Sequence, residues 1–269
     1  MKVLFLGCGN MGAAIAAGLL RACLEARLIV VDRDIDRAKS LLPADGVQFL
    51  DSLAPLQGQT FDVTVLAVKP QQFAAQPASD FPQDCGLVIS IMAGVTVEAL
   101  QARFGPDRTV RMMPNLPALV SRGMTVGYAP AGVSAQDRTQ ATRIFEGSGR
   151  VEWLEHEWQI DSATAVAGSG PGYVFAFVHH LAEAARAEGL PDALADLLAE
   201  ETLFGAAALL EADPRPVLDL KRAVTSRHGT TQAGLSVLEM DEGLPRLLRS
   251  AVRAARERSL ALAQEVGRY

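Results

Sequence analysis

Residues 2–12 read KVLFLGCGNMG and place a complete GxGxxG motif, Gly7 to Gly12, directly after a short apolar run. Such a motif is typical of dinucleotide binding when it follows a strand and starts a helix. Gly7 permits the tight turn, Gly9 lets the backbone approach a pyrophosphate, and Gly12 lets helix and strand pack closely. The N–H groups of the helix start would then hold the phosphates. This stretch therefore predicts a fold that binds a nicotinamide cofactor.

The flanking sequence alternates strand-like and helix-like segments up to about residue 158. Apolar strand-like runs lie at 27–31, 61–68, 83–94, 109–115, 124–131 and 150–155, and helix-like segments lie at 9–22, 36–42, 95–104 and 137–148. Short apolar runs bounded by Gly, Pro and Asp and separated by helices are typical of a doubly wound parallel sheet. We therefore expect an α/β fold in which residues 1–158 form a dinucleotide-binding Rossmann-type domain with a doubly wound, mostly parallel sheet.

The composition changes after residue 158, where strand-like runs vanish and Ala and Leu dominate. In the last stretch Leu244, Leu247, Leu248 and Ala251 fall on one helical face. A helical half of about 110 residues can form a tight bundle, and a bundle that small can be shared between subunits. We expect residues 159–269 to form an all-helical substrate and dimerisation domain.

The charge and composition exclude several classes of protein. Hydrophobic residues make up 49% and charged residues 21% of the chain, so it can bury a core and is not disordered. Its 25 Lys and Arg against 31 Asp and Glu give a net charge of −6, which argues against a nucleic-acid partner. A small anionic ligand held at a local site stays compatible with this balance.

The cysteines and the chain start predict a cytoplasmic protein with no membrane segment. Cys8, Cys23 and Cys85 are odd in number and form no CxxC pair, so neither a disulfide framework nor a zinc site is expected. His179 and His180 are adjacent and point in different directions on a helix, so we expect no metal there. Four apolar residues after Lys2 are too few for a signal-peptide core of roughly 7–15 residues, and no apolar run approaches the ~20 residues of a membrane span.

Two neighbouring residues give opposite indications about the cofactor. Asp32 ends the second strand-like run 20 residues after Gly12, where a carboxylate would accept the ribose hydroxyls of NAD. Arg33 follows directly, and an arginine there can pair with the 2′-phosphate of NADP. Asp32 favours NADH if it points inward, and a plain turn or helix cap is the alternative for it. The cofactor is therefore NADPH or NADH.

Further candidate cofactor residues follow the next strand-like runs, because ligands of open α/β sheets bind at carboxyl ends of strands. Ala67-Val68-Lys69-Pro70 ends the third run, and Lys69 could contact a ribose or phosphate or lie in solvent. Small residues around Ala93 would admit the nicotinamide ribose. Asn115 lies between two prolines, which favours an extended turn and an amide donor near the nicotinamide.

Two polar islands lie in the helical half. Residues 167–173, AGSGPGY, put glycines and a proline into a helical pattern that starts near Ile160, which permits close approach of a ligand or helix. Residues 225–231, TSRHGTT, precede a helical segment and so lie at a helix N-terminus. A helix N-terminus with hydroxyls is suited to a carboxylate, although Thr230 or Thr231 could serve as an ordinary cap.

The motifs GCGNMG, AVKP, SIMAG, RMMPNLP, AGSGPGY and TSRHGTT, in this order and spacing, resemble the pyrroline-5-carboxylate reductase family. The resemblance covers nearly the whole chain, and the last two motifs are its specific part. It implies an oxidoreductase that reduces the C=N bond of 1-pyrroline-5-carboxylate with NAD(P)H to give L-proline, the last step of proline biosynthesis. It also implies a homodimer with interleaved helical domains, and it allows a ring of dimers.

By the same resemblance, site residues can be named. The cofactor would contact the glycine loop, the third strand end and the fourth, which are Gly7, Cys8, Gly9, Asn10, Met11, Gly12, Ala67, Val68, Lys69, Pro70 and Ala93. Ser226 and the backbone N–H groups of Gly229 and Thr230 would hold the substrate carboxylate, and Thr231 would be the catalytic residue, with its hydroxyl on the ring nitrogen.

The loop departs from the family's usual SPGGTT or SKGGTT, since Arg227 and His228 precede Gly229. A histidine is strained at a position that needs a positive φ, and it can change the substrate fit or add a titration near neutral pH. Another cyclic imine carboxylate therefore stays open as the substrate. A β-hydroxyacid-type dehydrogenase would need a catalytic lysine in the helical half, where the only lysine is Lys221, just before the loop. A cofactor-binding regulator without turnover is a further alternative.

Overall fold

The structure, a computed structural model, describes residues 1–266, which fall into two compact units. The first unit consists of residues 1–169 together with the end of the last helix from Ala255, and the second consists of residues 170–254. The expected boundary at residue 158 divides the chain by function and stays a prediction.

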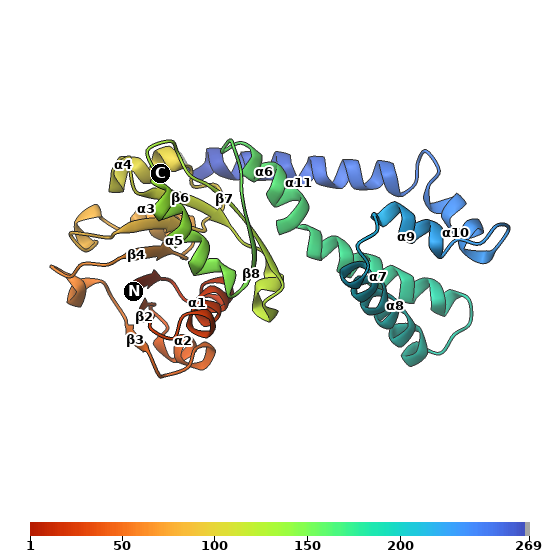
Figure 1. The fold of residues 1–269 in the computed structure, drawn as a ribbon, viewed down its shortest axis with the longest axis horizontal. Coiled ribbons are helices and arrows are strands. Elements are labelled where there is room, and N and C mark those ends of the chain that lie inside the picture. Colours follow the sequence, from red (N-terminus) through yellow and green to blue (C-terminus); the bar gives the residue numbers. More distant parts are fainter. Residues whose placement is uncertain (267–269) are drawn as a thin grey trace. The chain divides into compact units, whose positions relative to one another are not determined.

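The first unit contains one eight-stranded sheet, shown with its helices in Figure 1. The strands are β1 Lys2–Leu6, β2 Arg27–Val31, β3 Val47–Leu50, β4 Val63–Leu66, β5 Leu87–Ser90, β6 Thr109–Met113, β7 Gly123–Tyr128 and β8 Gly149–Trp153. Their order in the sheet is β3-β2-β1-β4-β5-β6-β7-β8, and each neighbouring pair is parallel except β6 with β7. The expected doubly wound, mostly parallel sheet is confirmed.

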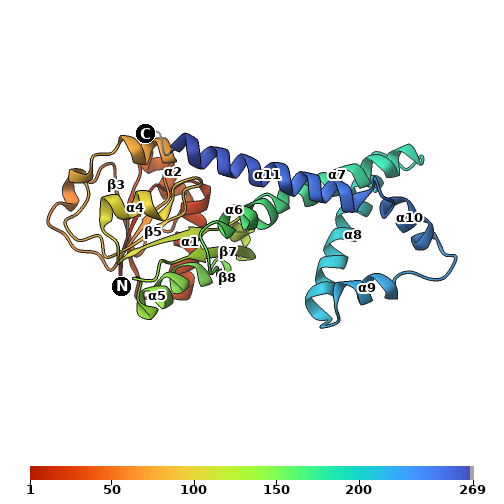
Figure 2. The same ribbon diagram turned by 90° about the horizontal axis from the view of Figure 1, so that it is seen from above.

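Helices cover both faces of this sheet, as the turned view in Figure 2 shows. The α-helices of the first unit are α1 Asn10–Ala22, α2 Ile35–Leu41, α3 Pro70–Ala75, α4 Val97–Phe104, α5 Ala135–Glu146 and α6 Gln159–Ala163. Short 3-10 turns lie at Ala54–Leu56, Ala78–Asp80 and Leu116–Val120. Apolar side chains of α1, α2 and α5 pack on one face, and those of α3 and α4 pack on the other.

Alternate residues of each strand pack on opposite faces of the sheet. Successive residues of a strand point to opposite faces, so Val3 and Phe5 lie in the core beneath α1 and α5 whereas Leu4 and Leu6 lie in the core beneath α4. Because both faces are covered, the buried residues 3–6 of β1 and 28–31 of β2 are apolar without interruption. Because β1, β2 and β4 are adjacent and parallel, their carboxyl ends lie together at the same end of the sheet.

The helical interruption expected at residues 167–173 lies a few residues earlier, as a π-helical turn, Thr164–Gly168, between α6 and α7, and residues 170–173 form the start of α7. The amide of Asn115 donates a hydrogen bond to the carbonyl of Ala167 within this turn, 2.8 Å away. A π turn is a usual way to accommodate an extra residue within a helix. Here the side chain of a distant loop satisfies one of its carbonyls.

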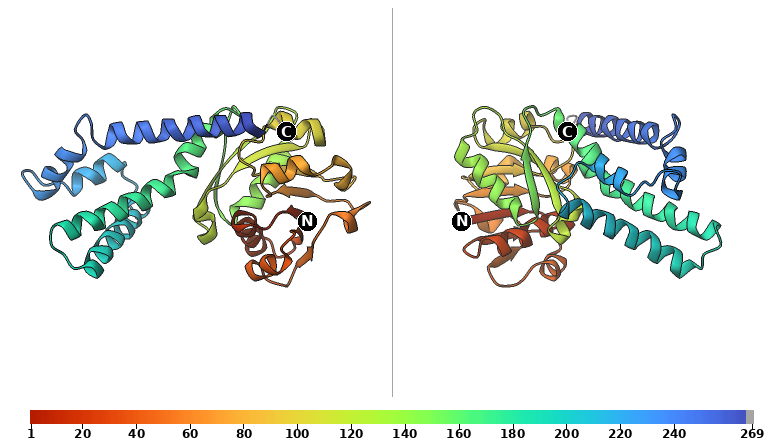
Figure 3. Two further views of the ribbon diagram at one scale, coloured as in Figure 1. Left: turned by 180° about the vertical axis from the view of Figure 1, so that it is seen from behind. Right: turned by 45° about the vertical axis from the view of Figure 1, so that its right-hand side comes forward.

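The second unit is entirely helical in its regular structure. It contains α7 Gly170–Ala187, α8 Asp192–Ala212, α9 Val217–Ala223, α10 Thr230–Leu238 and the first part of α11 Leu244–Val266. The helices α7 and α8 form a hairpin whose arms lie side by side in both views of Figure 3. The expected helical character of this half is confirmed.

Candidate functional site

The glycine loop connects β1 to α1 beside the point in the sheet where the strand order reverses, because β2 and β3 lie on one side of β1 and β4 lies on the other. β1 lies between β2 and β4, and such a switch point leaves a crevice outside the carboxyl ends of the strands. Gly7 has a φ of +95°, and its N–H donates to the carbonyl of Val31 over 2.8 Å. A residue with a β-carbon would be strained in this turn, since left-handed φ values favour glycine.

The three glycines differ in what a side chain would meet, and this difference tests the fit of a dinucleotide. A β-carbon on Gly12 would lie 2.7 Å from the carbonyl oxygen of Gly7, and one on Gly7 would lie 2.7 Å from the carbonyl oxygen of Ala67. A β-carbon on Gly9 would meet no atom within 4 Å. Glycine is thus required at positions 7 and 12 because neighbouring backbone leaves no room for a side chain, whereas Gly9 faces open space where a phosphate can approach the backbone. The residues present fit a dinucleotide.

The start of α1 supplies donors for that phosphate. Gly9 is the N-terminal cap of α1, and no side chain caps the helix. The first N–H groups of a helix have no partner within it, so they are suited to an anion. No acidic residue lies in the first turn to compete with a phosphate.

A cleft of about 780 Å³ lies along the same edge of the sheet. Of the expected cofactor residues, those that line it are Gly7, Gly9, Asp32, Arg33, Ala67, Val68 and Lys69. Cys8 and Gly12 are buried beneath the loop, and Asn10 and Met11 are in the first turn of α1. The cleft thus joins the ends of β1, β2 and β4, as expected from the three motifs.

Asp32 lies in the cleft, but both of its carboxylate oxygens accept hydrogen bonds from the backbone. One oxygen accepts the N–H of Cys8 at 2.6 Å, and the other accepts the N–H of Asp34 at 3.0 Å. Asp32 therefore ties the end of β2 to the glycine loop. Its charge is directed to backbone donors, which weakens the sequence argument that it selects NADH.

Two arginines face the same part of the cleft. Arg33 is exposed and lines the cleft, and so does Arg37, one turn further along in α2. The guanidinium of Arg37 also donates to the side-chain oxygen of Asn10 at 3.1 Å. Sequence reasoning missed Arg37, which lies in the first turn of α2, whereas Arg33 lies in the bend before the helix cap Asp34. The available signal was a second arginine at the start of the helical segment that follows Asp32.

Burial raises the pKa of the Cys8 thiol to about 11, and the nearby carboxylate of Asp32 adds to this shift. The thiol therefore stays protonated near neutral pH. The thiol beneath the loop therefore adds no negative charge to the phosphate site.

Ala93 and Asn115 do not line this cleft. Ala93 lies in the loop that follows β5, where Gly94 has a φ of +78°. Asn115 is buried; its amide group donates to Ala167 and its oxygen accepts the N–H of Met124 at 2.8 Å. Asn115 thus holds backbone in place, and a contact with the nicotinamide stays a prediction.

The expected substrate loop lies in the second unit, between α9 and α10. The N–H of Gly229 donates to the carbonyl of Ser226 at 3.1 Å, which closes a tight turn. A β-carbon on Gly229 would lie against the hydroxyl of Ser226, so a larger residue there would force that hydroxyl to turn away. α10 begins at Thr230 without a side-chain cap, and Thr230 and Thr231 are exposed. The loop thus presents hydroxyls and uncapped N–H groups together, which suits a carboxylate.

His228 has a φ of +60°, so the residue that replaces a glycine of the family pattern sits in the left-handed region. The strain expected for this position is present. The N–H of His228 donates to the side-chain oxygen of Gln232 at 2.6 Å. Gln232, at the third position of α10, was not foreseen; a Gln three residues after a helix cap usually accepts the N–H of the cap itself, and here it accepts that of the preceding residue.

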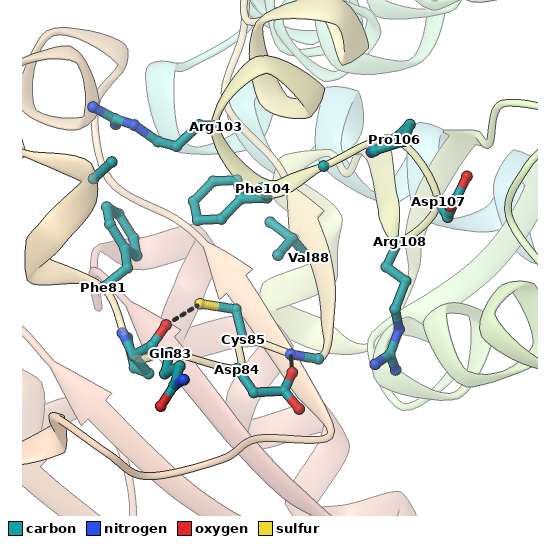
Figure 4. Close-up of a pocket in the computed structure, with 14 residues that line it drawn as sticks. Phe81, Gln83, Asp84, Cys85, Val88, Arg103, Phe104, Pro106, Asp107 and Arg108 are labelled. Atoms are coloured by element: carbon teal, nitrogen blue, oxygen red, sulfur yellow. Dashed lines mark hydrogen bonds between the residues drawn. The ribbon is translucent and has the colours of Figure 1, made fainter.

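A second cavity, of about 520 Å³, lies at the opposite edge of the sheet and is shown in Figure 4. Its residues precede β5 and β6, and Phe81, Phe104 and Cys85 are among those drawn. Burial raises the pKa of the Cys85 thiol to about 11, and this thiol donates to the carbonyl of Pro82. Ligands of open α/β sheets bind at the carboxyl ends of strands, so this cavity is the weaker candidate.

Residues 1–266 contain no group of three or more His, Cys, Asp and Glu side chains arranged to hold a metal ion. None of the helices in this part of the chain is both long and apolar enough to cross a bilayer.

Two family models match the chain. Residues 157–262 match the model described as pyrroline-5-carboxylate reductase dimerisation. Residues 2–94 match the model described as NADP oxidoreductase, coenzyme F420-dependent. The two matches correspond to the helical part of the chain and to the part that contains the glycine loop.

Curated relatives match over most of the chain. The pyrroline-5-carboxylate reductase of Pseudomonas aeruginosa is 34% identical over 270 aligned residues, which cover 99% of this chain and 98% of the relative. That of Escherichia coli is 36% identical over 245 residues, which cover 88% of this chain and 90% of the relative.

Solved structures agree with these matches. A pyrroline-5-carboxylate reductase from Coxiella burnetii is 32% identical, with a TM-score of 0.84, and 97% of this chain and 98% of that chain are covered. A Plasmodium falciparum pyrroline carboxylate reductase solved with NADP bound is 29% identical, with a TM-score of 0.80, and 98% of each chain is covered.

Proposed function

The chain belongs to the pyrroline-5-carboxylate reductase family, and on that premise we propose that it reduces 1-pyrroline-5-carboxylate to L-proline with NAD(P)H. The observation that carries the proposal is that the chain has both half-sites of this reaction. One is the glycine loop, in which Gly9 faces open space whereas Gly7 and Gly12 are packed against backbone. The other is the start of α10 beside Ser226, which no side chain caps. An NAD(P)H-dependent imine reductase needs both of them.

The reaction sets modest demands on the protein. When bound, NAD(P)H would supply a hydride to the ring carbon of the C=N bond and become NAD(P)⁺, and the imine would take up one proton from solvent on the ring nitrogen. A protonated imine accepts hydride readily, so the protein has mainly to hold the ring in position, which is worth several kcal/mol. We propose that Ser226 and the N–H groups of Gly229 and Thr230 bind the carboxylate, with the Gly229 N–H shared between the carboxylate and the carbonyl of Ser226. We also propose that Thr231 holds its hydroxyl on the ring nitrogen.

The cofactor half is proposed on the residues at the edge of the sheet. The N–H groups at the start of α1 would hold the pyrophosphate, with Gly9 giving access to the backbone. The remaining predicted contacts, at the strand ends of β4 and β5, would hold the nicotinamide half. These are Ala67, Val68, Lys69, Pro70 and Ala93.

We further propose that the protein prefers NADPH over NADH. Asp32 already accepts two backbone hydrogen bonds, and Arg33 and Arg37 line the cleft beside it. A hydrogen bond to a charged group contributes about 1.5–3 kcal/mol, equivalent to about 10- to 100-fold in kcat/KM. Arg33→Ala should therefore lower the ratio of kcat/KM for NADPH to that for NADH by about this factor. An unchanged ratio would assign Arg33 to solvent.

The experiment that tests the function is the oxidation of NADPH and NADH, followed by nicotinamide absorbance, with 1-pyrroline-5-carboxylate and with its six-membered homologue. We expect turnover with the five-membered imine and its loss in Thr231→Ala, with the Kd for NADPH retained. Turnover with the six-membered imine alone would change the substrate but keep the reaction class. Binding of NADPH without oxidation by either imine would contradict the proposal and favour a regulator.

Homodimerisation through the helical half is also proposed, with interleaved domains. The buried apolar side chains of the second unit are Ala182, Ala195, Ala199 and Leu220, which are mostly small. Most of its large apolar side chains are exposed, and Phe204 is 60% exposed. Extensive exposed apolar surface marks an interface.

A substitution of Phe204 tests the dimer. Phe204→Glu should shift the protein toward monomer in sedimentation equilibrium, whereas Leu24→Glu should leave the mass unchanged because Leu24 is exposed in the first unit. A monomeric wild type at micromolar concentration would contradict the dimer. A ring of dimers would give a larger mass in the same measurement. A cytoplasmic location stays a prediction from the cysteine pattern.

A further inference from the structure

The loop of residues 91–96 leaves β5 at its carboxyl end and carries Ala93, the residue that we expect beside the nicotinamide ribose. The N–H of Ile91 donates to the carbonyl of Leu66 at 3.1 Å, and the N–H of Met92 donates to the hydroxyl of Ser90 at 3.2 Å. These bonds fix the first residues of the loop to the sheet. Its far end, where α4 starts, is fixed by other residues.

That far end is bound by a carboxylate from a distant part of the chain. The N–H of Val97, the first residue of α4, donates to Glu157 at 2.8 Å. The N–H groups at a helix start attract negative charge, so a carboxylate suits this position. Glu157 lies 60 residues further along the sequence, shortly before α6.

The same oxygen of Glu157 also pairs with a buried arginine. Arg111 lies on β6 in register with Ser90 of β5, and its side chain is 4% exposed. Its guanidinium lies 3.1 Å from that oxygen. The Nε of Arg111 is buried with no hydrogen-bond partner among the described residues. Because a buried guanidinium needs a compensating charge, Arg111 holds the Glu157 carboxylate in place.

The other side of the loop is closed by backbone. A β-carbon on Gly94 would come within 3.1 Å of backbone atoms of Leu262 and Ala263 in α11. α11 is itself tied to α6, because the hydroxyl of Ser259 donates to the carboxylate of Asp161 at 2.7 Å. The loop therefore has no room to move toward α11, and Glu157 fixes its other end.

We propose that Arg111 and Glu157 are positioning residues for the nicotinamide half of the cofactor. They act through the loop of residues 91–96 and the start of α4, and they do not touch the cofactor. This inference rests on the proposed function, which puts Ala93 at the nicotinamide ribose. The adenine half is held elsewhere, at Arg33, Arg37 and the glycine loop, and is independent of the pair.

The test compares two ligands on the full-length protein. NADPH contains both halves of the cofactor, and adenosine 2′,5′-bisphosphate contains only the adenine half. In Glu157→Ala we expect the Kd for NADPH to rise about tenfold and kcat to fall about 10- to 100-fold, because misplacement by about 1 Å costs up to about 100-fold. The Kd for the bisphosphate should stay within about twofold, since the adenine half does not use the pair.

Two further variants separate positioning from general loss of structure. Glu157→Gln keeps an acceptor oxygen for Val97 and removes the charge, so it should recover part of both losses. It also serves if Glu157→Ala does not fold. Glu155→Gln, at an exposed carboxylate two residues earlier, is the matched control and should leave both Kd values and kcat unchanged.

Each outcome of this comparison of ligands and variants supports or overturns the inference. Selective weakening of NADPH, with partial recovery in Glu157→Gln, supports the inference. Equal weakening of both ligands, or no change in either, overturns it while wild-type turnover keeps the proposed function intact. Failure of the wild type to bind NADPH overturns the proposed function and the inference together.

Discussion

His228→Gly should stabilise the protein, because it removes a strained backbone conformation from the loop before α10. His228 has a φ of +60°, and the left-handed region costs a residue with a β-carbon about 1–2 kcal/mol. Glycine avoids this cost but loses about 0.5–1 kcal/mol more conformational entropy on folding. The difference leaves a net gain of about 0.5–1 kcal/mol. The bond from residue 228 to Gln232 is made by the backbone N–H, so the substitution retains it.

The assay is urea unfolding followed by circular dichroism, at one fixed protein concentration because association contributes to apparent stability. His228→Ala is the matched control, since it removes the imidazole but keeps the β-carbon and hence the strain. We expect His228→Gly to unfold at higher urea than the wild type, and His228→Ala to unfold near it. A change in KM for the imine that both variants share would be assigned to the imidazole.

Equal stability of the two variants would refute the reasoning, because it would mean that no strain is stored at this φ. So would a glycine variant that is less stable than the wild type. In either case the loop would have to relax around the histidine in solution.

Three further predictions follow from contacts in the first unit. Gly9→Ala should leave the free energy of unfolding nearly unchanged but raise the Kd for NADPH, because a β-carbon there meets no atom of the protein and enters the space for a phosphate. Gly12→Ala should instead lower the free energy of unfolding by about 1–3 kcal/mol, because its β-carbon clashes with a backbone carbonyl. Ser259→Ala should lower the free energy of unfolding by about 1.5–3 kcal/mol, because it leaves the buried carboxylate of Asp161 without this donor. Folding raises the pKa of the Cys8 thiol from 9.0 to about 11, so its contribution to stability is present below about pH 9 and is lost as the pH rises through 11. Between pH 9 and 11, Cys8→Ser should therefore lose less stability than the wild type.

The controls for these predictions come from the same set of variants. Equal unfolding free energies for the two glycine variants would contradict the different surroundings of the two positions. An unchanged stability of Ser259→Ala would mean that water replaces the lost donor. Parallel pH profiles for the wild type and Cys8→Ser would mean that the thiol is as accessible to solvent in the folded protein as in the unfolded chain.

Much of the first unit follows from short stretches of sequence. The apolar runs before Gly7 and before Asp32, and the glycine spacing, correctly predicted strands, a turn and a helix. β3 at Val47–Leu50 was not predicted, because it is only four residues long and half-buried, and neither was α3 at Pro70–Ala75, which lacks an apolar period. The antiparallel pairing of β7 with β6 does not follow from the sequence either, because pairing direction depends on contacts between distant segments.

The direction of individual side chains was decided by the tertiary structure. The sequence placed Asp32 at the end of β2, but only the folded chain directs its carboxylate to the N–H of Cys8, 24 residues away. The same holds for Glu157, whose bonds to Arg111 and Val97 span 46 and 60 residues. Turns, helix starts and apolar periods are properties of a few consecutive residues, so the sequence by itself determined the fold class and the glycine loop. The family pattern indicated that His228 replaces a glycine, but the φ of +60° that strains it was found only in the structure. Hydrogen bonds between segments far apart in the chain depend on how those segments pack, so the site's charge arrangement emerged only in three dimensions.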